Sequence, residues 1–163
     1  MVSIRRAESR DLPRISSLLR QLEDLLEAAP DAGQVDARAI WAEMAEAPQV
    51  YVNLVAEEGE EVVGFVSMIC YRTLFHPGGT ALINELVVDR DKRGLGIGHA
   101  LLNRAVELGK AAGMDEIEVG AETTNHGAIT FYRRQGFGLE YLLLGRELER
   151  VCGPAGPQPE TPD

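Results

Sequence analysis

Three glycines lie within six residues in the stretch RGLGIG, residues 93–98, just before a predicted helix. Glycine costs conformational entropy in regular structure, so this cluster suggests that another group must come close to the backbone. A glycine-rich turn at the start of a helix presents unpaired N–H groups and the positive end of the helix dipole, which together bind phosphate. Arg93 adds a guanidinium group at the edge of the turn. The spacing Arg93-x-x-Gly96-x-Gly98 therefore predicts a phosphate-binding loop.

Two widespread phosphate-binding patterns do not fit this loop. The P-loop needs Lys followed by Ser or Thr, but His99 stands five positions after Gly94 and no such pair follows it. The dinucleotide fingerprint GxGxxG needs a third glycine, and His99 or Leu101 occupies that position. The loop therefore belongs to another kind of phosphate site.

A carboxylate interrupts the apolar run ALINELVV, residues 81–88. A charge in such a run is costly unless it is solvated, paired or functional, so Glu85 is a candidate base. Strict alternation along a strand puts Glu85 on the face of Ile83 and Val87, opposite Asn84 and Leu86. Two other roles remain open for Glu85, namely binding a substrate amine and pairing with an arginine.

Hydrophobic periodicity predicts the elements that hold these residues. Strands are expected over residues 2–7, 50–58, 61–72, 80–89, 116–122 and 137–148, and helices over 10–26, 35–47, 98–112 and 126–135. Ser9 is the expected N-cap of the first helix. The order predicts a mixed α/β layer with one parallel crossover between about residues 81 and 121.

A second motif, NHGAITFYRRQGF over residues 125–137, accompanies the glycine loop. With Arg93-x-x-Gly96-x-Gly98 it resembles the GNAT family of N-acetyltransferases, over roughly residues 2–149. The resemblance implies the acyl-CoA N-acyltransferase fold, a mixed central β-sheet flanked by helices. We expect one such domain over residues 1–150 and a disordered tail rich in Pro and Gly over 151–163.

The resemblance also implies a donor, acetyl-CoA, and its binding residues. The pyrophosphate is expected on the backbone amides of residues 94–99, and the pantetheine arm in a gap where residues 86–88 separate from the strand 116–122. The expected cofactor-binding residues are Leu86, Val87, Val88, Arg93, Gly94, Gly96, Ile97, Gly98, His99, Asn125 and Tyr132. Asn125 is equally suited to be a helix N-cap. No metal is expected.

Acetyl transfer to an amine needs a base for the ammonium proton and benefits from an acid at the leaving thiolate. The resemblance places Tyr132 beside the coenzyme sulfur as that acid, while its alternative role is packing or a hydrogen bond to the coenzyme. It makes Glu85 the base, acting through water, with Glu122 as a second candidate. A backbone N–H near Val87 or Val88 would polarise the carbonyl.

Three further side chains have weaker cases. His126 and His76 are further candidate bases, with a plain surface histidine as the alternative for each, and the loop holding His76 is a candidate to reach the acceptor. Trp41 is expected either in the core or at the acceptor pocket. Cys70 and Cys152 form no CxxC pair, which indicates a reducing cytoplasm and no zinc site.

The formal net charge of -10 argues against nucleic acid or an anionic membrane as the partner and fits a cationic small molecule. The stretch INELVVD, followed by a short loop and HGAITFYRRQGF, most resembles the branch of the family that acetylates small molecules, which implies a small-molecule amine acceptor. The alternatives are a protein lysine or N-terminal acetyltransferase, and a CoA-binding sensor without catalysis. The resemblance also suggests a homodimer formed through the late strands.

Overall fold

The computed structural model describes residues 2–25 and 36–146. The described residues form a five-stranded sheet in the order β1-β2-β3-β4-β5. The strands are β1 (Val2–Arg6), β2 (Tyr51–Glu58), β3 (Glu61–Tyr71), β4 (Thr80–Val88) and β5 (Glu116–Val119). All neighbours are antiparallel except β4 and β5, which are parallel. The predicted mixed sheet with a single parallel crossover is confirmed.

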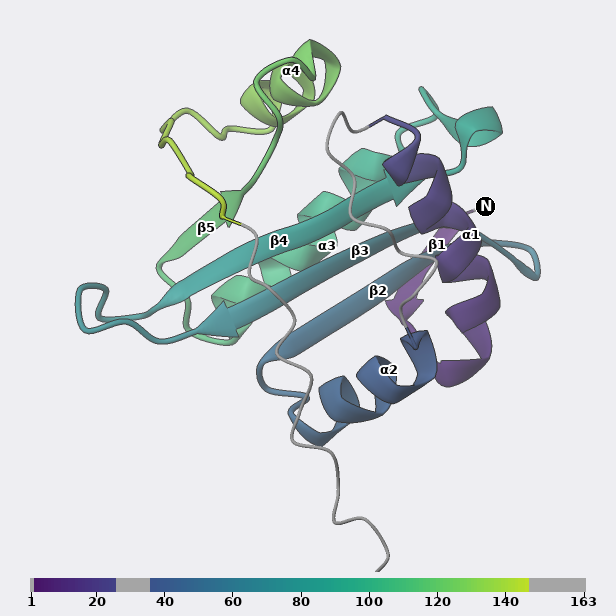
Figure 1. The fold of residues 1–163 in the computed structure, drawn as a ribbon, viewed down its shortest axis with the longest axis horizontal. Coiled ribbons are helices and arrows are strands. Elements are labelled where there is room, and N and C mark those ends of the chain that lie inside the picture. The colour runs from purple at the N-terminus through teal and green to yellow at the C-terminus, as the bar shows by residue number, and fades with distance from the viewer. Residues whose placement is uncertain (1, 26–35, 147–163) are drawn as a thin grey trace, which may run out of the picture.

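Helices cover both faces of the sheet, with α1 and α2 on the front in Figure 1 and α3 behind. The helices are α1 (Leu12–Glu23), α2 (Ala37–Glu46), α3 (Ile97–Ala111) and α4 (His126–Arg134), with short 3-10 turns at Ser9–Asp11 and Arg90–Lys92. None of the helices in the described ranges is long and apolar enough to cross a membrane.

Two apolar clusters hold the layers together, one on each face of the sheet. Behind the sheet, Ile97, Leu101 and Leu102 of α3 pack on Val66 and Met68 of β3. In front, a smaller cluster joins α1 to the sheet through Ile15, Leu18, Val55, Phe65 and Val87. Burial of these apolar side chains is the main force that fixes the helices on the sheet.

An ion-pair cluster fixes the start of α1. The Arg5 guanidinium donates to Asp11 at 2.7 Å and to Glu57 at 2.8 Å, which ties β1, α1 and β2 together. Asp11 accepts from the backbone N–H of Glu8, while Glu8 caps the preceding turn. The expectation that Ser9 is the N-cap is wrong, because the capping box formed by Glu8 and Asp11 starts the helical segment one residue earlier.

The predicted closing strand is also wrong over the part that the structure describes. Residues 137–146 form neither helix nor strand, and Leu139, Tyr141, Leu142 and Leu144 are exposed. A strand forms only where a neighbouring edge can pair with its backbone, and β5 is four residues long. The tail over residues 151–163 lies outside the described residues.

Candidate active site

The site begins where the two parallel strands separate. β4 and β5 are in register only from Thr80–Ile83 against Glu116–Val119. β4 then continues to Val88, paired with β3 but no longer with β5. Residues 120–125, predicted as the end of the strand and the turn after it, instead diverge and lead to α4. The second half of β4 therefore has a backbone edge that β5 does not use.

A β-bulge lies at the same point. Ser67 pairs with Glu85 while the next residue of β3, Met68, pairs with Ile83, so Asn84 is an extra residue in β4. The bulge reverses the alternation of side chains. Ile83 packs in the cluster with α3, whereas Val87 packs in the cluster with α1.

Because of the bulge, the prediction that Glu85 shares a face with both Ile83 and Val87 is wrong for Ile83. Glu85 does share a face with Val87, since the two are separated by one residue in extended strand beyond the bulge. It does not share a face with Ile83. The structure therefore turns Glu85 toward the α1 side of the sheet and leaves Leu86 and Val88 on the α3 side.

A cavity of about 1260 Å³ occupies the gap between the strands. It is lined by β4, the glycine loop, residues 120–125 and α4, and it reaches Leu22 and Leu25 at the end of α1. The cavity therefore passes from the start of α3 to the α1 side of the sheet. All of the predicted cofactor-binding residues line this cavity, namely Leu86, Val87, Val88, Arg93, Gly94, Gly96, Ile97, Gly98, His99, Asn125 and Tyr132.

The glycine loop has the geometry that its sequence suggests. Gly94 and Gly96 have φ of 77° and 81°, values that other residues rarely adopt. Gly96 is the N-cap of α3, so the free amides at the start of the helix face the cavity end of the loop. The Arg93 side chain donates from Nε to the Val88 carbonyl at 3.1 Å, which holds the loop against the end of β4.

α4 closes the opposite wall of the cavity. The Asn125 side chain accepts a hydrogen bond from the backbone N–H of Ala128 at 3.0 Å, so its role as helix N-cap is confirmed. Tyr132 packs edge-on against Phe131 and Phe137, with ring centroids 5.3 and 5.7 Å apart. Burial raises the pKa of Tyr132 to about 12, so its phenol remains a proton donor at neutral pH.

Glu85 is half-buried and lies beside Ser67. Burial raises the pKa of Glu85 above its ordinary value, and a hydrogen bond from Ser67 opposes that rise. Glu85 itself does not line the cavity; its neighbours Asn84, Leu86 and Val87 do, and Glu85 lies on the α1 side of the sheet with Val87. This placement suits a carboxylate that acts through an intervening water.

The structure also adds residues that the motifs did not single out. Lys92, Thr123 and Thr124 line the cavity, as does Asn84. Lys92 is bonded to Glu58 at 2.6 Å. Ser67 was missed as well, although one signal for it existed, a single hydroxyl in the apolar run VVGFVSMIC of β3.

The other candidates fall in different places. Glu122 lines the cavity, which keeps it a second candidate for the base. His76 lies 3.0 Å from Glu116 at the start of β5, the opposite end of that strand from the cavity. α2 has no buried residue, so Trp41 is not in the core. His126 begins α4 but does not line the cavity.

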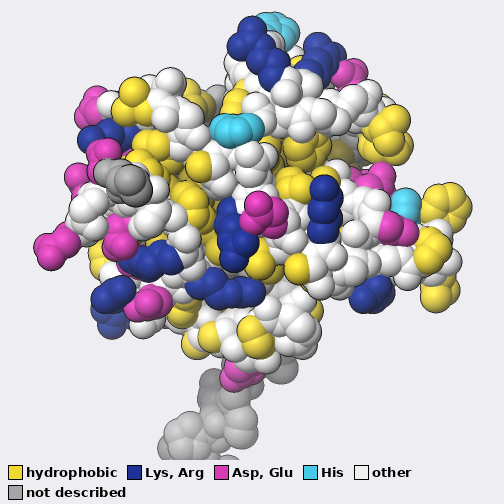
Figure 2. Space-filling view, turned by 180° about the vertical axis from the view of Figure 1, so that it is seen from behind, with side chains coloured by type: hydrophobic (Ala, Val, Ile, Leu, Met, Phe, Trp, Pro, Cys, Tyr) yellow, Lys and Arg dark blue, Asp and Glu magenta, His cyan; other side chains and the backbone are white. Residues whose placement is uncertain are grey.

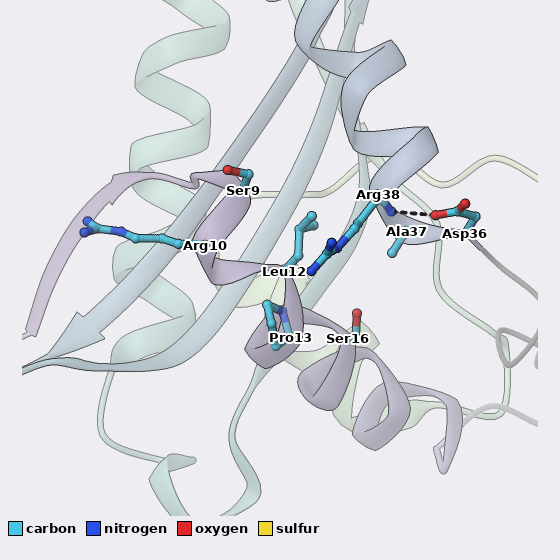
Figure 3. Close-up of a pocket in the computed structure, with 8 residues that line it drawn as sticks. All are labelled: Ser9, Arg10, Leu12, Pro13, Ser16, Asp36, Ala37 and Arg38. Atoms are coloured by element: carbon cyan, nitrogen blue, oxygen red, sulfur yellow. Dashed lines mark hydrogen bonds between the residues drawn. The ribbon is translucent and has the colours of Figure 1, made fainter.

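A second, smaller cavity of about 330 Å³ lies between the starts of α1 and α2. Figure 3 shows Arg38 reaching toward Leu12 while Arg10 points away, and Arg10 lies 3.0 Å from Glu8. Asp36 caps α2 by accepting from the Arg38 backbone N–H at 3.1 Å. This cavity is at the opposite end of α1 from the Leu22 and Leu25 that line the large one.

Charges on the α3 side are mixed. Figure 2 shows Lys and Arg side chains lying among Asp and Glu side chains across the described part of this face, with no single basic area. This pattern agrees with the overall net charge of -10. It does not resemble the continuous positive surface that nucleic-acid binding needs.

The two parallel strands separate beside the glycine-rich start of α3, and the cavity runs through the gap between them. This arrangement has the shape and the free helix-start amides that an extended phosphate-containing ligand needs. Residues 15–137 match the model of the acetyltransferase (GNAT) family. The chain belongs to this family, and the predicted acyl-CoA N-acyltransferase fold is confirmed.

Similar proteins agree with this assignment. The chain is 42% identical over 100 residues to an uncharacterized N-acetyltransferase of Methanocaldococcus jannaschii, a match that covers 60% of this chain and 44% of that protein. It is 33% identical over 138 residues to an L-methionine sulfoximine/L-methionine sulfone acetyltransferase of Pseudomonas paraeruginosa, covering 83% of this chain and 79% of the relative. A solved structure, a putative acetyltransferase from Agrobacterium tumefaciens, has a TM-score of 0.77 at 23% identity and covers 89% of this chain and 99% of its own.

Proposed function

We propose that this protein transfers the acetyl group of acetyl-CoA to the primary amine of a small molecule. The observation that carries the proposal is the cavity between β4 and β5. It joins the helix-start amides of the glycine loop to Tyr132 and to the α1 side of the sheet, where Glu85 lies. One end of the cavity suits the phosphates of the donor, and the other end suits an acceptor.

The donor-binding residues fit the shape of coenzyme A. The pyrophosphate is bound by the amides of residues 94–99, because Gly94 and Gly96 bring the backbone close to it and the α3 dipole adds positive charge. The pantetheine arm lies along residues 86–88, where β5 has left the edge of β4 unused. Such an edge satisfies the amide groups of the arm as an added strand would.

In the reaction a proton must leave the ammonium group of the acceptor and a proton must reach the leaving thiolate, and Glu85 and Tyr132 are the proposed groups for these two transfers. Glu85, acting through water, accepts a proton from the ammonium group of the acceptor. The free amine attacks the thioester carbonyl, whose oxygen is stabilised by a backbone N–H near Val87 or Val88. A carbon–nitrogen bond forms, the carbon–sulfur bond breaks, and Tyr132 gives a proton to the leaving thiolate. The attacking nitrogen loses its remaining extra proton to water, and the Tyr132 phenolate takes a proton back from water, so that the neutral amide and the CoA thiol are the products.

The acceptor is proposed to be a small molecule because of the relative matched over most of both chains, which by its name acetylates methionine derivatives. The net charge of -10 favours a cationic acceptor over an anionic polymer. A domain over residues 1–150, a cytoplasmic location and a homodimer complete the proposal.

The test is release of CoA thiol from acetyl-CoA over a panel of amines. The panel holds L-methionine sulfoximine and sulfone, aminoalkylphosphonates, polyamines, aminoglycosides, other amino acids, and peptides with a lysine or a free N-terminus. We expect release with one class of small molecule. Release with peptides alone would make the protein a protein acetyltransferase, and acetyl-CoA binding without any release would favour a sensor.

A further inference from the structure

We infer that Ser67 is a positioning residue for Glu85, holding its carboxylate at the α1 side of the cavity for the acetyl transfer proposed above, on which this inference rests. Ser67 and Glu85 are register partners on β3 and β4, and Ser67 acts on the Glu85 carboxyl as a group that lowers its pKa. Ser67 is buried, with 3% of its surface exposed. Its hydroxyl therefore has a fixed direction.

The bulge explains why this pairing exists. Without the extra residue Asn84, strict alternation would keep Glu85 on the face of Ile83, toward α3. The bulge turns Glu85 to the face of Val87 and brings it opposite Ser67. Bulges commonly redirect a side chain beside an active site. The bulge sets the face, and the Ser67 hydroxyl sets the position of the carboxylate on that face.

A hydroxyl at this point of β3 is not explained by packing. Phe65 and Val66 beside it are buried apolar residues, and so is Met68. A buried hydroxyl without a partner costs free energy, so an apolar side chain would suit a purely structural position better. The partner that Ser67 has is the carboxyl group proposed as the base.

Neighbouring charges do not replace Ser67 in this role. The ionisable groups on the elements around Glu85 are Arg14, Arg20 and Glu23 on α1 with Asp24 as its C-cap, Glu61, Cys70 and Tyr71 on β3, and Glu116 and Glu118 on β5. Arg14 forms an ion pair with Asp89, and Asp24 forms an ion pair with Arg90. Glu116 is bonded to His76. Burial raises the pKa of Glu85, and Ser67 is the group that lowers it.

The experiment compares Ser67→Ala and Ser67→Thr with the unchanged chain. The first readout needs no acceptor: the Glu85 carboxyl carbon is followed by NMR against pH in protein labelled with ¹³C-glutamate, and assigned by its loss in Glu85→Gln. We expect Ser67→Ala to move this titration to higher pH and Ser67→Thr to restore it, because a hydrogen bond to the charged form lowers a carboxyl pKa.

The second readout is kcat/KM against pH with the best amine of the panel. Ser67→Ala should move the acid limb to higher pH in parallel with the NMR titration and lower kcat on the order of tenfold. The KM for acetyl-CoA should stay unchanged. In a Glu85→Gln background the same substitution should have no further effect.

Thr80→Val is the matched control, since Thr80 is a second buried hydroxyl and lies at the start of β4, away from Glu85. It should alter thermal stability without moving either pH curve. An unchanged Glu85 titration in Ser67→Ala would overturn the inference, and so would a shifted titration with unchanged kcat. Full activity of Glu85→Gln would instead overturn Glu85 as the base, and the positioning role would fail with it.

Discussion

Arg14 of α1 and Asp89 at the end of β4 lie 2.5 Å apart, which anchors the helix to the strand four residues before Arg93. Asp89 also accepts from the backbone N–H of Asp91 at 3.0 Å and from the Gln21 side chain at 3.3 Å. Three donors from two segments therefore meet on one buried carboxylate. Because Arg14 and Gln21 belong to α1, this arrangement holds the segment just before the glycine loop against that helix.

Asp89→Asn should destabilise the fold and weaken donor binding together. Hydrogen bonds to a buried charged group are worth about 1.5–3 kcal/mol, so we expect a loss of about 2 kcal/mol in the free energy of unfolding. Acetyl-CoA affinity, measured by calorimetry, should fall severalfold because the loop loses its anchor. Glu58→Gln is the control: it breaks the more exposed pair with Lys92 and should leave the free energy of unfolding nearly unchanged.

The same carboxylate makes stability depend on pH. The Asp91 N–H and Arg14 hold the pKa of Asp89 below its ordinary value of 3.8. The charged form is thus favoured in the folded state, so its contribution is present above the ordinary pKa and is lost as the pH falls through the lowered one. Thermal unfolding between pH 6 and pH 2 should show a smaller decline for Asp89→Asn than for the unchanged chain.

Glu85→Gln should abolish most activity while making the fold more stable at neutral pH. Loss of a general base lowers kcat by about 10²–10⁴-fold. Burial raises the Glu85 pKa, which means that its charged form is disfavoured on folding, and the neutral amide removes that cost above the raised pKa. The measurements are kcat against pH, whose acid limb should vanish, and the melting temperature at pH 7.

Glu118→Gln is the matched control for that substitution. Glu118 lies on the same face of the sheet, since its neighbours Ile117 and Val119 pack toward α3. It should leave kcat nearly unchanged. Equal losses in the two variants would mean that the acidic face as a whole, and not Glu85, carries the effect.

The sequence predicts most of the features that local patterns determine. The strands expected over residues 50–58 and 61–72 form β2 and β3, the glycine loop starts α3, and Asn125 caps α4. Each of these depends on neighbours within a few residues, which a motif records. The same locality explains why the residues expected to bind the cofactor all line one cavity.

The position of Glu85 could not be predicted, because nothing in ALINELVV shows that Asn84 is an extra residue. A bulge depends on how two strands pair, and strict alternation assumes that they pair without one. The failure at residues 137–146 has a similar origin. Their apolar residues suit a strand, but strand formation requires a partner edge that the sequence does not specify.

Tyr132→Phe should lower kcat by roughly 10–100-fold without changing the dissociation constant for acetyl-CoA, because the ring and its packing remain and only the proton donor is lost. Tyr141→Phe is the control, since Tyr141 is 70% exposed and does not line the cavity. With the Tyr132 pKa at about 12, this phenol should produce no basic limb in kcat below pH 10. A rate within threefold of the unchanged chain would rule out the acid role.

Gly96→Ala and Gly59→Ala separate the strain of a positive φ from ligand binding. Gly96 and Gly59 have φ of 81° and 67°, and an added Cβ would meet no atom within 4 Å at either position. Both substitutions should therefore cost about 1–2 kcal/mol of stability through backbone strain alone. Gly96→Ala alone should also weaken acetyl-CoA binding, by tenfold or more, because its Cβ is added where the pyrophosphate would approach the backbone. Stability is measured by urea denaturation and acetyl-CoA affinity by calorimetry. Equal affinities in the two variants would show that the pyrophosphate does not bind at this loop.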